Sequence, residues 1–277
     1  MRLVQPKAYL VAKTSLIEEG IQNYIDDIGS PNWSIDKNVS DGENLIEAAG
    51  RMCYRSWQEY DENKPQGTNP NVKKIRKGNT DYIGNVLKQK HGSIFEHVSA
   101  TFILKDVSRV FTHELVRHKA GTAYSQESLR YIRLDNLGFW IPKALRGNLE
   151  AVKIVKDVYA FLEGVQIKMS DLFNIDKISD FHTKKELTSA FRRLAPCGLA
   201  TTIMVTGNLR AWRHIIETRT SEGAEEEIRM VISFVADILS KEYPNVFQDM
   251  SINEKNEYVF ENKKVWTGIN YINLELF

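Results

Sequence analysis

The sequence is poor in the features that mark secreted, membrane and metal-binding proteins. Its 277 residues include only two cysteines, Cys53 and Cys197, too few for a disulfide framework or a cysteine-rich metal site. We expect both to be small buried hydrophobic side chains. No stretch approaches the roughly 20 apolar residues of a membrane helix, and residues 1–7 lack the apolar core of a signal peptide. These absences predict a cytoplasmic protein without a membrane contact or a metal centre.

The sequence also lacks an excess of either positive or negative charge. The chain has 37 basic and 36 acidic residues and a net charge of +1, so it creates no long-range field for nucleic acid or anionic lipid. Any anion site must therefore be a local cluster. With 42% hydrophobic residues, the chain can bury a full core. No proline-, serine- or glycine-rich linker and no internal repeat divides it, and we predict one domain over residues 1–277.

Hydrophobic spacing and turn residues predict an α+β fold, in which long helices pack on a small mixed or antiparallel sheet. Ser40 and Glu43 form a capping-box pattern at the start of a helix, and Ser108 can cap another. The sequence has no Gly-x-Gly-x-x-Gly fingerprint, so we expect no Rossmann fold. We predict helices over residues 40–57 and 81–90 and after Ser108, a strand over 98–104, irregular stretches over 61–80 and 134–148, and a hairpin or interface arm after residue 250.

Two long stretches carry apolar residues at helical spacing. Such a stripe is core far more often than it is a binding site, so we expect both stripes to be buried. The first consists of Ile154, Val158, Phe161, Val165 and Met169, and the second of Ile228, Val231, Ile232, Val235 and Leu239.

A first cluster of polar residues lies at 90–97, where two histidines and a glutamate surround Gly92. Their spacing is not the helical i, i+4 spacing of a zinc protease, so a metal is not expected. The residues alone leave two interpretations open. The segment is either a turn that contacts a ligand or a turn that Ser93 caps, with Glu96 and His97 satisfying neighbouring backbone groups.

A second cluster follows the helix that Ser108 begins. Glu114, Arg117 and His118 are spaced at i, i+3 and i+4, which places them on one helical face. Cations, hydroxyls and amides together suit a phosphate-bearing ligand, because guanidinium groups fork onto phosphate oxygens. The alternative is a solvated charged face that contains a Glu–Arg pair. Further along, Gln126, Ser128 and Arg130 alternate, so an extended segment would direct them to one side.

A third cluster lies between Arg192 and Arg229 and is rich in arginine. An apolar run over 200–205 is followed by Asn208 and a helix that ends near Arg219. On that helix Asn208 and Arg219 share one face, and Arg210 lies on the adjacent one. Arginines that snorkel over an apolar helix explain any one of these residues. They explain the whole set less well.

In this order the three clusters resemble the flavin-dependent thymidylate synthases. That family carries an Arg-His-Arg triplet followed by a short spacer and a Ser-x-Arg-Tyr sequence. Lys119 stands where the triplet usually ends in arginine, Glu114 and Glu225 stand where glutamine is common, and the spacer is one residue longer. The resemblance covers roughly residues 45–245, and the matching motifs are His91–His97, Arg117–Lys119, Ser128–Tyr131, Arg192 with Pro196, Asn208 with Arg210, and Arg219 with 224–229.

The resemblance implies a single reaction. A methylene group passes from methylenetetrahydrofolate to C5 of dUMP, reduced FAD supplies the hydride that completes the methyl group of dTMP, and NADPH reduces the flavin. It also implies a homotetramer whose active sites are shared between subunits. The cofactor carries the difficult chemistry, whereas the protein supplies position and electrostatic field.

Residue roles follow from the same resemblance. Arg219 is the catalytic residue, which stabilises an ionised uracil because a guanidinium stays protonated. Ser128 is a phosphate-binding hydroxyl rather than a nucleophile, since no histidine is clearly placed to activate it. The implied dUMP contacts are Glu114, Arg117, Gln126, Glu127, Ser128, Leu129, Arg130, Arg192 and Arg219. The implied FAD contacts are His91, Ser93, Arg117, His118, Lys119, Gln126, Asn208, Arg210 and His214.

Two other functions fit the same residues. One is a methylase or hydroxymethylase of another pyrimidine nucleotide, such as UMP, which side-by-side turnover would separate from the first. The other is a non-enzymatic nucleotide- or RNA-binding module, which predicts a colourless protein with a steeply salt-dependent affinity. The enzyme predicts a protein that is yellow or takes up FAD.

Overall fold

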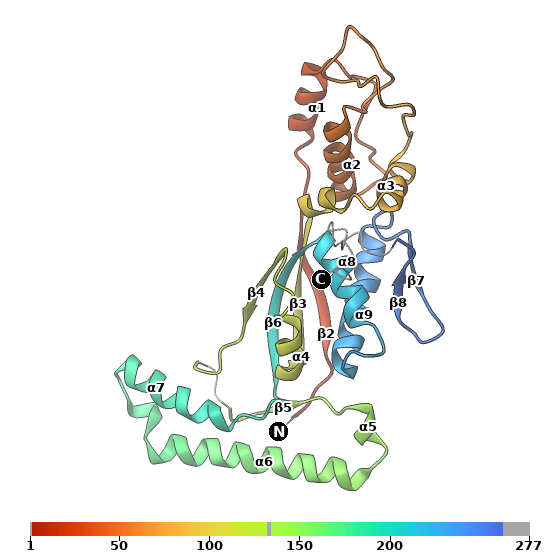
Figure 1. The fold of residues 1–277 in the computed structure, drawn as a ribbon. Helices are drawn as coiled ribbons and strands as arrows, with labels where there is room; N and C mark the ends of the chain where they lie inside the picture. Colours follow the sequence, from red (N-terminus) through yellow and green to blue (C-terminus); the bar gives the residue numbers. More distant parts are fainter. Residues whose placement is uncertain (1, 132–133, 263–277) are drawn as a thin grey trace, which may run out of the picture.

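A four-stranded sheet forms the centre of the protein (Figure 1). The computed structural model describes residues 2–131 and 134–262. Neighbouring strands of this sheet are antiparallel, which confirms the predicted α+β fold with a small antiparallel sheet. The predicted strand over 98–104 is the first part of a longer one. In spatial order the strands are β2 (Lys7–Lys13), β3 (Ser99–Ser108), β6 (Ala200–Asn208) and β4 (Thr122–Gln126).

Helices pack on one face of this sheet, and two of them continue directly from its central strands. α4 (Arg109–Leu115) follows β3, α8 (Leu209–Arg219) follows β6, and α9 (Glu226–Glu242) packs against both helices. Ser108 caps α4 as predicted, because its Oγ accepts a hydrogen bond from the backbone N–H of Phe111 at 3.0 Å. Since β3 and β6 run in opposite directions, α4 and α8 begin at opposite ends of the sheet.

The main hydrophobic core lies between the sheet and these helices. Alternate residues of the strands point into it, and Phe102, Leu104 and Val205 are fully buried, whereas Met204 on the other face is 42% exposed. All five residues of the second predicted stripe, on α9, are fully buried in the same core. That prediction is confirmed, since α9 is covered by the sheet and by α8.

The N-terminal region forms a small lobe at one end of the sheet (top of Figure 1). Ser40 caps α2, since its Oγ accepts from the N–H of Glu43, as the capping-box pattern predicts. A second hydrophobic cluster around Ile25, Trp33 and Trp57 holds the lobe together. The predicted loop over 61–80 is irregular up to Gly78. The elements of the lobe are α1 (Glu18–Asp27), α2 (Asp41–Tyr54), α3 (Asn79–Lys88) and the 3-10 helix η1 (Gly92–His97).

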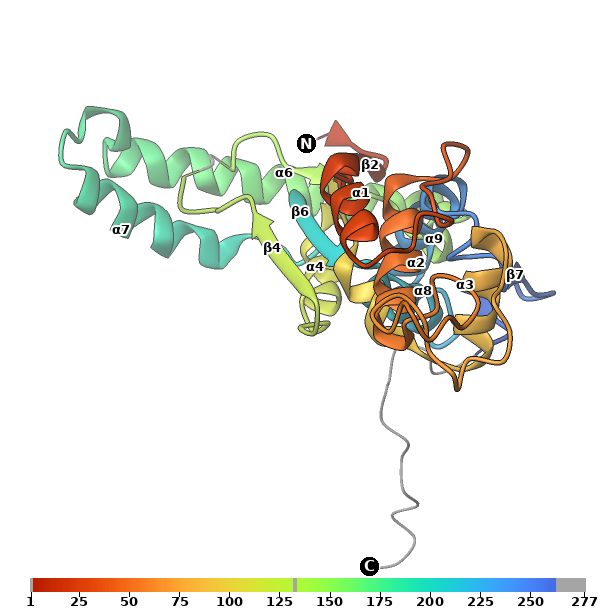
Figure 2. The same ribbon diagram turned by 90° about the horizontal axis from the view of Figure 1, so that it is seen from above.

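A helical arm lies at the opposite end of the sheet, where α6 and α7 run side by side away from the body (Figures 1 and 2). The predicted irregular stretch over 134–148 leads into the arm and contains only short elements. The elements here are β5 (Gly138–Phe139), α5 (Lys143–Arg146), α6 (Leu149–Leu172), η2 (Ile175–Lys177), α7 (Phe181–Phe191) and η3 (Arg192–Leu194).

The prediction that the apolar stripe of α6 is buried is wrong. Ile154 is 57% exposed and Phe161 69% exposed. The buried face of α6 instead carries Tyr159 and two polar residues that serve neighbouring backbone groups. The Glu163 carboxylate accepts from the N–H of Leu137 at 2.6 Å, and the Gln166 amide donates to the carbonyl of Phe191 at 3.1 Å. The inward face of α6 is therefore not the predicted stripe, and it is held both by these hydrogen bonds and by the packing of Tyr159 in a small hydrophobic cluster.

Both cysteines are exposed, so the expectation that they are buried is also wrong. Cys53 lies in the last turn of α2, and Cys197 lies in the connection between η3 and β6, where the chain passes over the surface. The predicted hairpin after residue 250 is confirmed as β7 (Met250–Ile252) paired with β8 (Tyr258–Phe260), and residues 263–277 lie outside the described ones. A short parallel pair joins β1 (Arg2–Leu3) to β5.

Among the helices within residues 2–131 and 134–262, none combines the length and the apolar character of a membrane span.

Candidate active site

Arg219 lies at the end of α8 and meets the end of α4 there. Its Nε donates to Nε2 of His118 at 2.8 Å, its Nη1 donates to the Glu114 carboxylate at 2.9 Å, and its Nη2 donates to the Glu114 carbonyl at 3.1 Å. The side chain of Arg219 is 18% exposed and that of Glu114 is 29% exposed. Segments about a hundred residues apart in sequence thus converge on one guanidinium group that solvent still reaches.

This meeting depends on where α4 ends. The helix stops at Leu115, and residues 116–118 form a turn in which the N–H of His118 donates to the carbonyl of Leu115 at 3.1 Å. The Tyr124 hydroxyl on β4 holds the turn by donating to the carbonyls of Leu115 and His118. The predicted helical face of Glu114, Arg117 and His118 is therefore wrong for Arg117, whereas Glu114 and His118 do lie together at Arg219. Arg117 follows the helix and is exposed, and Glu114 pairs with Arg219 instead.

His118 is neutral in this site. Burial, together with the neighbouring Arg219 and His214, lowers its pKa from 6.5 to about 4. A neutral imidazole accepts a hydrogen bond at one nitrogen only, so the bond from Arg219 to Nε2 places the proton on Nδ1. The His214 ring stands edge-on to the His118 ring, with 5.1 Å between centroids. Burial lowers the pKa of His214 as well.

Asn208 joins the start of α8 to the loop before β4. Its side chain caps the helix by accepting from the N–H of Ala211 at 2.8 Å, and its own N–H donates to the carbonyl of Gly121 at 3.0 Å. Gly121 has a positive φ of 72°, and a Cβ there would lie 2.5 Å from Nδ2 of Asn208. Only glycine allows this close approach.

His91, Ser93 and Arg210 line one cavity of 520 Å³ between the lobe and α8. Arg210 forms an ion pair with Glu96 of η1, and the Tyr54 ring stacks on His91. His91 precedes η1, and no side chain caps that helix. The interpretation in which Ser93 caps the turn is therefore wrong, and His91 and Ser93 remain exposed.

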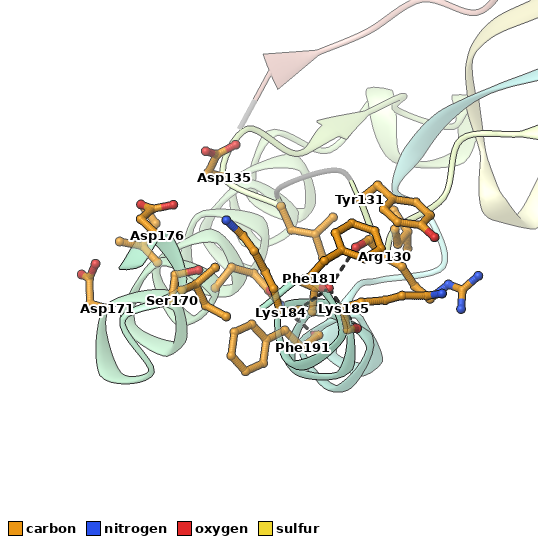
Figure 3. A pocket seen from close by; sticks show the side chains of 16 residues that line it. Arg130, Tyr131, Asp135, Ser170, Asp171, Asp176, Phe181, Lys184, Lys185 and Phe191 are labelled. Carbon is orange, nitrogen blue, oxygen red and sulfur yellow. Dashed lines mark hydrogen bonds between the residues drawn. The ribbon is translucent and has the colours of Figure 1, made fainter. Parts of the chain in front are cut away.

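Arg130 and Arg192 line a second cavity of 470 Å³, at the base of the arm beside α7. Ser128 lies in the turn before Arg130, where its Oγ accepts from the N–H of Arg130 at 3.4 Å. Arg130 also borders a third cavity, of 440 Å³, between α6 and α7. In Figure 3 its guanidinium points away from that cavity, whereas Lys184 and Lys185 stand on α7.

A family model for "Thymidylate synthase complementing protein" matches residues 35–245. A flavin-dependent thymidylate synthase of Mycobacteroides abscessus is 34% identical over 255 residues, which is 90% of this chain and 92% of that protein. The chain belongs to the flavin-dependent thymidylate synthase family. A synthase of the same description from Corynebacterium diphtheriae is 32% identical over 79% of this chain and 82% of its own length. The family predicted from the three ordered motifs is thus confirmed.

A solved structure shares the fold of this family member. The crystal structure of the UMP/dUMP methylase PolB from Streptomyces cacaoi, bound with 5-Br UMP, superposes with a TM-score of 0.58 at 16% identity. The superposition covers 89% of this chain and 94% of that chain.

Three other residues predicted as contacts have structural partners. Gln126 donates to the Thr112 hydroxyl at 3.3 Å, the Glu127 carboxylate accepts from the N–H of Thr202 at 2.8 Å, and Leu129 packs against a small hydrophobic cluster that includes Tyr159. These residues therefore hold the segment that carries Ser128 and Arg130 against β6 and the arm.

Arg109 is a candidate that sequence reasoning missed. Burial lowers its pKa, and the nearby Arg192 lowers it further, so two cations lie close together at the start of α4. Its buried Nη1 has no hydrogen-bond partner in the described part of the chain. A buried donor without a partner is costly, and an anion would satisfy it. In the sequence, Arg109 directly follows the capping residue Ser108, and this pattern indicates only the start of a helix.

Proposed function

We propose that this protein is an FAD-dependent thymidylate synthase. It transfers a methylene group from methylenetetrahydrofolate to C5 of dUMP, and NADPH supplies the reducing equivalents. Family membership supports this function, and the observation that carries it is the convergence of Arg219, Glu114 and His118 from the two family motifs. The single domain over residues 1–277 is part of the same proposal.

Arg219 activates the pyrimidine in this proposal. Three of its donors are held by Glu114 and His118, and a guanidinium has five N–H groups, so two remain for the substrate. Because the guanidinium stays charged at any working pH, it cannot act as a base. It stabilises negative charge on the N3–C4–O4 side of uracil, which makes C5 more electron-rich.

The dUMP phosphate binds at the base of the arm. Arg130 and Arg192 face one cavity, and a forked guanidinium suits phosphate oxygens. The Ser128 hydroxyl donates to the same phosphate, and Arg109 beside Arg192 adds a further cation. Gln126, Glu127 and Leu129 hold the segment in place, and Arg117 reaches the nucleotide from the turn after α4.

The residues of the first cavity and of the segment after α4 fit a flavin, which supplies hydride transfer when it is bound. Arg117 and Lys119 are exposed cations, and an FAD pyrophosphate needs such partners. The imidazole of His118 keeps its Nδ1 proton as a donor, since Nε2 is occupied by Arg219. The proposed FAD contacts are His91, Ser93, Arg117, His118, Lys119, Gln126, Asn208, Arg210 and His214.

A homotetramer with shared active sites completes the proposal. The apolar side chains on α6, with Phe161 69% exposed, would be covered by other subunits, because large exposed apolar patches mark interaction surfaces. Site residues that lie in separate cavities of one chain could then face a common ligand.

The absorption spectrum of the purified protein, with and without added FAD, is the first test. A bound flavin and conversion of dUMP to dTMP with methylenetetrahydrofolate and NADPH are the expected results. Faster turnover of UMP than of dUMP would make the protein a methylase of another nucleotide. A colourless protein that takes up no FAD and binds RNA with a steep salt dependence would refute the enzyme.

A further inference from the structure

Glu114 holds Arg219 at two points. Its carboxylate accepts from Nη1, and its backbone carbonyl accepts from Nη2. His118 accepts from Nε on the third side. A planar guanidinium that is held on three nitrogens has its plane and direction fixed, and its remaining donors are aimed at one place. Glu114 therefore determines where Arg219 points.

The same carboxylate changes the electrostatic field of Arg219. Among the titratable side chains that face the guanidinium, His118 and His214 are neutral, because burial lowers both pKa values. Glu217 of the same helix acts on His214. Glu114 is ion-paired with Arg219 at 2.9 Å. A negative charge at that distance offsets part of the positive field that a ligand beside Arg219 experiences.

We propose that Glu114 is a positioning residue for Arg219: it fixes the guanidinium in place and moderates its charge. This inference rests on the proposed function, in which the pyrimidine lies beside Arg219. A glutamate at position 114 thus fixes the direction of the Arg219 guanidinium. It also leaves Arg219 with a weaker positive field than a neutral side chain at 114 would.

Two substitutions separate these effects. Glu114→Gln keeps an oxygen acceptor for Nη1 and removes the charge, so the N3 proton of a bound pyrimidine becomes about tenfold more acidic. Glu114→Ala removes both the charge and the side-chain acceptor. The Glu114 carbonyl and His118 still hold the other two nitrogens, but the guanidinium loses its fixed direction at Nη1. We expect this loss to outweigh the removed negative charge, so N3 of the bound ligand becomes less acidic than in the wild type. The two variants therefore shift the N3 acidity in opposite directions.

The probe is 5-fluoro-dUMP bound to the FAD-loaded protein and followed by fluorine NMR across pH, since ionisation at N3 changes the fluorine shift. Steady-state kinetics with dUMP accompany the titration. We expect kcat of Glu114→Ala to fall at least tenfold, with a smaller change in KM. Glu222→Gln is the matched control, because it removes a surface carboxylate three residues after Arg219 that pairs with Lys255. It should leave the N3 titration unchanged.

Three outcomes overturn the inference. The N3 titration could be the same in both Glu114 variants as in the wild type, both variants could shift it in the same direction, or Glu114→Gln could raise KM alone, as loss of a direct nucleotide contact would. If Glu114→Ala does not fold, Glu114→Gln decides by itself, through the acidity of N3. A wild-type protein that binds FAD but no 5-fluoro-dUMP would refute the proposed function, which is a different result.

Discussion

The body of the protein, formed by the central sheet with α4, α8 and α9, differs from the helical arm of α6 and α7 in how its charged residues are held. In the body, Arg219 is fixed by three hydrogen bonds. In the arm, Arg130 and Arg192 border an open cavity. The body thus presents a preorganised cation, whereas the arm presents cations that a ligand must bring together.

The same contrast holds for the apolar residues. α9 and α6 have similar helical stripes in the sequence, yet Val235 on α9 is fully buried and Phe161 on α6 is 69% exposed. Periodicity predicts that a helix has an apolar face. It does not say which part of the protein, or which other subunit, covers that face.

Removal of the preorganised cation should have the largest effect. In Arg219→Ala we expect turnover of dUMP to fall about a thousandfold, because a fixed charge at a developing anion is worth that much, while FAD still binds. The measurement is kcat together with flavin absorbance. The control is Arg146→Ala, whose guanidinium packs over Trp140 far from the site. Near-normal turnover of Arg219→Ala would show that the activating role belongs elsewhere.

Matched truncations on the two stripes test the contrast in packing. Leu239→Ala in α9 should lower the free energy of unfolding by about 2–5 kcal/mol, since Leu239 is fully buried. Phe161→Ala in α6 should change the free energy of unfolding of the isolated chain by no more than about 0.5 kcal/mol. If other subunits cover this face, the destabilisation should grow with protein concentration. Urea unfolding at several protein concentrations measures both. Equal, concentration-independent costs would contradict the distinction.

The arm is tested through the phosphate. In Ser128→Ala we expect KM for dUMP to rise roughly tenfold, because a hydrogen bond to a charged group is worth about 1.5–3 kcal/mol, while kcat changes little. Steady-state kinetics over a range of dUMP concentrations up to saturation give both constants. If activity were lost although the nucleotide still bound, Ser128 would be a nucleophile instead.

The smallest effect concerns the histidine of the body. The pKa of His118 is lowered from 6.5 to about 4, so the unfolded chain binds more protons between these values and the free energy of unfolding falls as pH drops through this window. Full stability from this group is present above pH 6.5. This pKa shift contributes at most about 3 kcal/mol to the free energy of unfolding, and partial exposure of the side chain reduces that contribution to about 1 kcal/mol. In His118→Gln, the midpoint of thermal unfolding should depend less on pH between 6.5 and 4 than it does in the wild type. An unchanged pH dependence would show that another group causes it.

Local signals in the sequence predicted much of the fold. The Ser40 and Ser108 caps, the helix carrying Val235 and the strand before Ser108 all follow from neighbours within a few residues. The family followed from the order of its motifs. The pairing of Glu114 with Arg219, which lie 105 positions apart, could not follow, because it depends on where α4 ends and on which helix packs beside it. Arg109 was missed for the same reason, since only the folded chain brings it to Arg192.

The contact between Gly121 and Asn208 has an evolutionary consequence. The amide at 208 occupies the space that a methyl group at 121 would need, so the two positions cannot vary independently. A descendant that acquires alanine at 121 must first shorten residue 208, and it then loses the cap that starts α8. Homologues that carry a side chain at 121 should therefore also differ at 208.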